Sequence, residues 1–76
     1  MGNNITILKS IAENGGNNIE HAENVIQFCN EALIDKHKAA AIDRFFINSP
    51  TSNPFESDMS YYDLLNFYQD VLNEED

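Results

Sequence analysis

The chain has 76 residues, of which 42% are hydrophobic, and its formal net charge is −9 at pH 7. A chain of this length has room for one modest core, so we expect residues 1–76 to form a single helical domain. The negative charge disfavours direct binding to nucleic acid or to an anionic membrane, and it favours a basic protein as partner.

The sequence contains one cysteine, Cys29, which excludes an internal disulfide and is typical of a reducing compartment. We expect Cys29 to be a small buried residue, because its neighbours supply no cation that would activate a thiolate. The first residues lack the basic region and the long apolar run of a targeting signal. We therefore expect a cytoplasmic protein.

The first predicted element is a short helix over residues 4–14, followed by the glycines at 15 and 16 as a stop signal. Its apolar residues fall on one helical face: Ile7, Leu8, Ile11 and Ala12. A strand over residues 4–8 is the alternative. No second strand candidate is present to pair with it, so we prefer the helix.

Residues 17–48 contain no Pro or Gly, and Asn17 and Glu20 have the spacing of a capping box at their start. Two apolar sectors follow, one made of Ala22, Val25, Ile26, Cys29 and Leu33 and one made of Ala39, Ile42, Phe45 and Phe46. Projection at about 100° per residue places these sectors well over a quarter turn apart. The segment is therefore either one long helix with changing neighbours or two helices that meet near residues 35–38.

Residues 48–54 include two prolines among Ser and Asn and predict a loop. Phe55 follows Pro54 directly and is expected to anchor the end of this loop in the core. The tripeptide Asn53-Pro54-Phe55 also resembles the ligand of EH domains, which insert the Phe into a pocket. We prefer the core anchor.

The last helix is predicted to begin at about residues 57–60, where Ser60 and Asp63 have the spacing of a second capping box. Its apolar residues form the most regular stripe of the chain: Tyr61, Leu64, Leu65, Tyr68, Val71 and Leu72. The patterns together predict an all-α fold, a small antiparallel bundle of three to four helices.

Charge is unevenly distributed, since residues 49–76 carry seven of the thirteen acidic residues and no Lys or Arg. No nucleophile with its base and no metal-ligand spacing is recognisable, so we expect no enzyme, cofactor or metal site. Tyrosines among carboxylates are typical of protein interfaces. The residues predicted to bind a partner are Glu56, Asp58, Tyr61, Tyr62, Asp63, Asp70, Glu74 and Glu75.

The sequence thus favours a non-enzymatic acidic protein that binds and inhibits a basic, nucleic-acid-binding protein. As in a nucleic-acid mimic, its carboxylates would occupy the Lys and Arg side chains that otherwise hold phosphates. The alternative is a structural or regulatory homodimer that buries the two apolar sectors of residues 17–48 against a second copy, its acidity serving solubility. The cations at Lys36, Lys38 and Arg44 are also candidates to pair with the acidic last helix.

Overall fold

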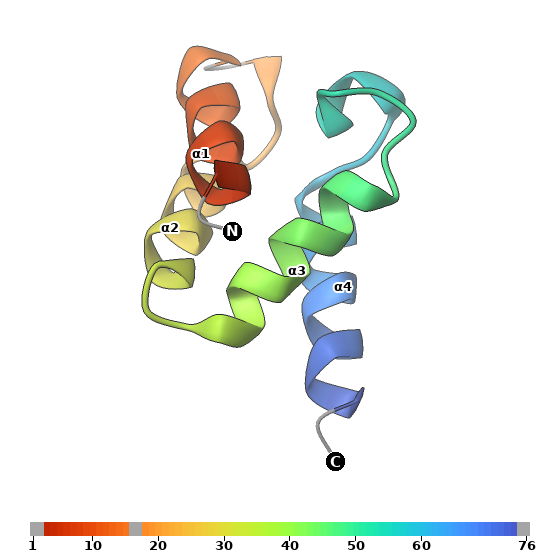
Figure 1. The fold of residues 1–76 in the computed structure, drawn as a ribbon. Coiled ribbons are helices and arrows are strands. Elements are labelled where there is room, and N and C mark those ends of the chain that lie inside the picture. The colour runs from red at the N-terminus through yellow and green to blue at the C-terminus, as the bar shows by residue number, and fades with distance from the viewer. Residues whose placement is uncertain (1–2, 16–17, 75–76) are drawn as a thin grey trace.

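The computed structural model describes residues 3–15 and 18–74, which form an all-α fold with no strand in these ranges (Figure 1). Its elements are α1 (Asn3–Gly15), α2 (Ala22–Ala32), α3 (Lys36–Ile47), the 3-10 helix η2 (Pro54–Ser57) and α4 (Tyr61–Glu74). Helices α1 and α2 run antiparallel as one hairpin, and α3 and α4 form a second hairpin. The predicted small helical bundle is confirmed. Across the described ranges, no helix has the length and apolar character needed to cross a membrane.

Helix α1 forms as predicted, but its buried face differs from the expected one. Ile5, Leu8 and Ala12 are buried, whereas Ile7 is 45% exposed. The helix packs against α3 as well as α2, and Asn4 Nδ2 donates a 2.8 Å hydrogen bond to Asp43 on α3. The contact with two helices therefore turns Ile5 inward and leaves Ile7 outside.

The predicted start of the second helix is wrong. Helix α2 begins at Ala22, and its N-cap is His21, which has a left-handed backbone (φ 62°) and makes no side-chain cap hydrogen bond. Asn17, half of the predicted capping box, lies outside the described residues. The other half, Glu20, has its Oε1 3.3 Å from His21 Nε2.

The central segment consists of two helices, which resolves the alternative that the sequence left open. Its second helix starts after Asp35, whose carboxylate accepts hydrogen bonds from the backbone N–H groups of His37 (2.9 Å) and Lys38 (3.3 Å). Asp is a preferred N-cap because this bonding satisfies amides that have no partner in the first turn. Leu33 lies in the turn before Asp35 and is 66% exposed, so its predicted place in the buried sector is wrong.

The core is centred on Phe45 of α3, which is fully buried. Its ring lies 5.5 Å from that of Phe55 and 6.5 Å from that of Phe67 on α4, both at steep angles that suit aromatic pairs. The prediction that Phe55 anchors the loop is therefore confirmed. Pro54 is also fully buried, so the folded chain does not present Asn53-Pro54-Phe55 as a free turn for an EH domain.

Helix α4 starts with the predicted pair. The backbone N–H of Ser60 donates to the Asp63 carboxylate (2.8 Å), and the Ser60 hydroxyl accepts from the N–H of Tyr62 (3.2 Å). Leu64 and Val71 form the buried centre of its apolar stripe. This helix and the loop before it position most of the residues that the sequence assigns to a partner.

Candidate functional site

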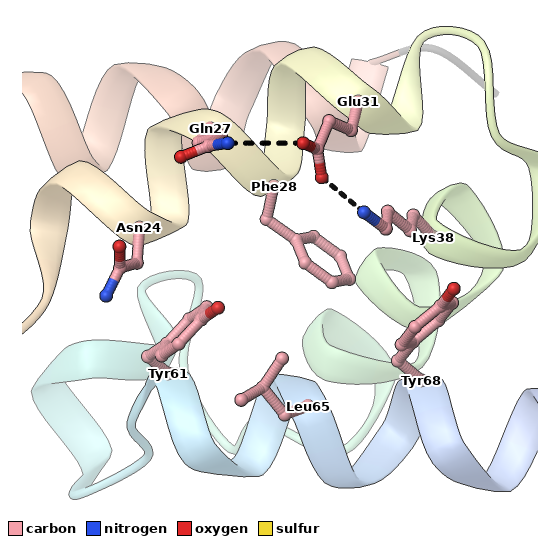
Figure 2. A pocket seen from close by; sticks show the side chains of 8 residues that line it. All are labelled: Asn24, Gln27, Phe28, Glu31, Lys38, Tyr61, Leu65 and Tyr68. Atoms are coloured by element: carbon pink, nitrogen blue, oxygen red, sulfur yellow. Dashed lines mark hydrogen bonds and ion pairs between the residues drawn. The ribbon is translucent and has the colours of Figure 1, made fainter.

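A pocket of about 200 Å³ opens between α2, the start of α3 and α4 (Figure 2). Three aromatic side chains, those of Phe28, Tyr61 and Tyr68, surround it together with Leu65. The Phe28 and Tyr68 rings meet edge to face, with their centroids 5.7 Å apart. Amides and a carboxylate line its polar side, so the pocket combines aromatic walls with a polar edge. We call it the aromatic pocket.

Lys38 closes one end of the aromatic pocket (Figure 2). Its Nζ lies 5.4 Å from the centroid of the Phe28 ring and 5.7 Å from that of Tyr68, and it donates to the carboxylate of Glu31. Gln27 donates a second hydrogen bond to Glu31 at 3.3 Å. The hydrogen bond from Lys38, followed by that from Gln27, lowers the pKa of Glu31, and the same bond to Glu31 raises the pKa of Lys38. The ammonium group of Lys38 thus already contacts two of the aromatic rings and the carboxylate of this pocket.

A larger hollow lies on a different part of the surface, between the end of α1, the connection to α2 and η2. It consists of two adjoining pockets of about 450 and 240 Å³, which share Asn18, Ile19 and Phe55. Ile11 adds an apolar wall to the larger pocket, and Met59 adds one to the smaller. We call the two pockets together the acidic groove.

Three carboxylates line the acidic groove: Glu20, Glu56 and Asp58. All three residues are exposed, and the described lining contains no Lys, Arg or His. The other polar groups of the lining are hydroxyls and amides. Glu20 has the imidazole of the neighbouring His21 3.3 Å away. Because apolar walls stand beside exposed carboxylates, the groove is complementary to a segment that is both apolar and basic.

Of the eight residues predicted to bind a partner, the seven that the structure describes do not form one surface. Glu56 and Asp58 lie together in the acidic groove, whereas Tyr61 turns into the aromatic pocket. Tyr62 is 56% exposed, with its ring 5.2 Å from that of His21. Tyr61 therefore forms part of a pocket wall, whereas Tyr62 lies on the surface.

The remaining acids on α4 are separate from the groove. Asp63 caps its own helix through Ser60, and Asp70 is exposed. Glu74 accepts hydrogen bonds from both terminal nitrogens of Arg44, which lowers the pKa of Glu74 and raises that of Arg44. Glu75 lies outside the described residues. Pairing of a cation with the last helix is therefore confirmed for Arg44, whereas Lys38 pairs with Glu31 of α2.

Sequence reasoning missed the contribution of the α1–α2 connection to the groove. Asn18, Ile19 and Glu20 were assigned to the first turn of a helix, yet they precede α2 and line the hollow. The available signal was Gly15 followed by the apolar Ile19. A Cβ at position 15 would overlap the Ile19 side chain, so only Gly allows Ile19 to lie against the end of α1.

Within the described ranges, no group of three or more His, Cys, Asp or Glu side chains is placed to hold a metal ion. Cys29 is fully buried as predicted, and burial raises the pKa of its thiol to about 11. A thiol in that state is mostly protonated at neutral pH and is a poor nucleophile.

Comparison with known proteins finds no matching family model, no matching curated protein and no matching solved structure.

Proposed function

We propose that this protein is a non-enzymatic acidic interaction protein that binds a basic protein and blocks the surface with which that protein holds phosphates. The observation that carries the proposal is the distribution of the ion pairs. Lys38 and Arg44 are paired with Glu31 and Glu74, while Glu20, Glu56 and Asp58 stand together without a Lys or Arg among the described groove residues. Among the described residues, the groove lining thus supplies no Lys or Arg to these three acids, and Glu20 has the imidazole of His21 close by, with Nε2 3.3 Å from Oε1.

This distribution changes the mechanism that the sequence suggested. The sequence assigned the contact to Glu56, Asp58 and the acids of α4 together, but Asp63 caps that helix and Glu74 is paired with Arg44. The carboxylates best placed to meet a partner's Lys and Arg are Glu56 and Asp58, joined by Glu20. Exposed acids increase the rate of encounter with a basic partner, and this effect weakens as salt screens the charges.

The homodimer alternative has a smaller apolar surface available to it than the two sectors of the sequence suggested. Of the two sectors of the central segment, Val25, Cys29, Ile42 and Phe45 are fully buried inside one chain. The large apolar side chains that remain exposed on that segment are Leu33, Ile34 and Ile47. Sedimentation of the purified protein at low and high salt tests the alternative, since a dimer joined by apolar contacts persists at high salt.

The proposal is tested by capture from a native lysate at low and high salt, with mass spectrometry of the bound proteins and competition by duplex DNA. We expect basic nucleic-acid-binding proteins that are retained at low salt, released at high salt and displaced by DNA. The double variant Glu56→Gln/Asp58→Asn should retain less of these basic proteins than the wild type. Glu23→Gln/Asp70→Asn is the control, because it makes the same change in charge away from the groove. Retention that is indifferent to salt and DNA would contradict the proposal.

A further inference from the structure

The geometry points to the acidic groove as the docking site for one segment of the partner, in which apolar side chains alternate with Lys or Arg. This inference rests on the proposed function and narrows it. The sequence alone suggested electrostatic attraction by acids spread over residues 56–75, without a groove. A groove with apolar walls instead selects the spacing of apolar and basic side chains in the segment that enters it.

The two pockets of the acidic groove share one apolar wall. Ile19 and Phe55 border both, Ile11 extends the wall at one end and Met59 extends it at the other. Phe55 is held from behind by the buried ring of Phe45, so this wall is anchored to the core. Two adjoining hollows along such a wall accept more than one apolar side chain of the same segment.

Three carboxylates stand at the rim of the acidic groove. Glu56 stands at the larger pocket, and Glu20 and Asp58 stand at the smaller one. A segment with apolar side chains in the groove would direct its intervening Lys or Arg side chains to these three acids. The uncharged rim groups Asn14 and Asn18 are suited to hydrogen bonds with its backbone.

The shape of the groove depends on Gly15. Its missing side chain lets Ile19 lie against the end of α1, and a Cβ there would meet Ile19 Cγ1 and Cδ1. Cδ1 is the end atom of the side chain and Cγ1 is the atom before it, so Gly15→Ala forces the Ile19 side chain to move. The substitution changes the apolar wall and leaves every charge in place.

The experiment uses two fluorescein-labelled peptides of equal charge, one with leucines alternating with lysines and one with serines in place of the leucines. Their binding to the full chain is measured by fluorescence anisotropy at low salt. We expect the leucine peptide to bind at least about tenfold more tightly than the serine peptide. Its leucines are removed from water when they pack against the apolar wall, which favours binding. Glu56→Gln/Asp58→Asn should weaken its binding about tenfold.

The variants are chosen to preserve the fold. Asp58 has a left-handed backbone (φ 65°), which Asn adopts readily, so Asp58→Asn removes charge without adding strain. Gly15→Ala should weaken the binding of the leucine peptide and leave the binding of the serine peptide unchanged. Ile19→Thr, which shortens the same half-buried side chain, repeats this test independently. Circular dichroism confirms that each variant is folded.

The possible outcomes distinguish a failure of the groove inference from a failure of the proposed function. If the two peptides bind equally, and Glu23→Gln/Asp70→Asn weakens binding as much as the groove variant, the groove inference is overturned while basic-partner binding stands. If neither peptide binds at low salt, the proposed function itself fails. A preference for leucine that Gly15→Ala and Ile19→Thr leave intact would also overturn the assignment to this groove.

Discussion

Arg44 on α3 and Glu74 in the last turn of α4 form a two-pronged ion pair, with Arg44 Nη1 2.7 Å from Glu74 Oε2. The pair joins residues that are thirty positions apart in the sequence. It places a cation beside the C-terminal end of α4, where the helix dipole is negative and a lone carboxylate is unfavourable. Glu74 thus stabilises the α3–α4 hairpin and is less available to a partner than its exposure suggests.

The pair predicts a pH-dependent contribution to stability. Because Arg44 lowers the pKa of Glu74 in the folded state, the contribution is present above the unfolded pKa of about 4.3 and is lost as the pH falls through the folded value. Arg44→Met should therefore be less stable than the wild type at neutral pH, and the difference should vanish toward pH ~3. Urea unfolding at both pH values measures this. Lys36→Met, which removes an exposed cation, is the control, and a difference that grows in acid would contradict the assignment.

The N-cap at Asp35 predicts a local cost. Asp35→Ala removes the acceptor for the N–H groups of His37 and Lys38 and should lower the free energy of unfolding by about 1 kcal/mol. Asp35→Asn keeps a capping side chain and should cost much less. Chemical denaturation followed by circular dichroism distinguishes the two. Equal losses in both variants would mean that the charge of Asp35 matters rather than its capping.

The position of Phe45 predicts the largest loss of stability. Its ring packs against both Phe55 and Phe67, so Phe45→Ala should cost about 3–5 kcal/mol, a large part of what a small domain possesses. Phe45→Leu fills much of the space and should cost less. Ile47→Ala, two residues later and 78% exposed, should change stability by less than about 0.5 kcal/mol. Thermal unfolding of the three variants provides the comparison.

Lys38 and Tyr68 should show measurable coupling. A double-mutant cycle with Lys38→Met and Tyr68→Leu should give an interaction of about 0.5–1 kcal/mol from the cation above the ring. The same cycle with Lys36→Met in place of Lys38→Met is the matched control and should give none. If the two cycles agree, the ammonium makes no specific contact with the ring.

The sequence predicted the helices well because their apolar periodicity is regular, as in Leu64 and Val71 of α4. It left the central segment undecided because no residue type at 33–38 forbids a helix. The break depends on Asp35 using its side chain as a cap, a choice among local hydrogen bonds that spacing alone does not reveal. Exposed Leu33 is the direct result of that choice.

The groove was harder to predict than the helices. It joins Ile19 to Phe55, which are far apart in the sequence and are brought together only when the two hairpins pack. Composition correctly indicated an excess of acid. It did not reveal that Glu74 is paired with Arg44, whereas Glu56 and Asp58 stand beside an apolar wall. Both distinctions depend on tertiary contacts between helices.

Because Cys29 is buried, the reaction of its thiol with a reagent reports transient opening of the folded core. The thiol is fully buried in the core cluster to which α1, α2, α3 and α4 all contribute, and it is the sole cysteine of the chain. A thiol reagent can therefore react only when the core around Cys29 opens, and the rate of labelling reports how often this happens. Any ligand that clamps the hairpins together would slow the reaction, which makes ligand binding readable without attaching a label.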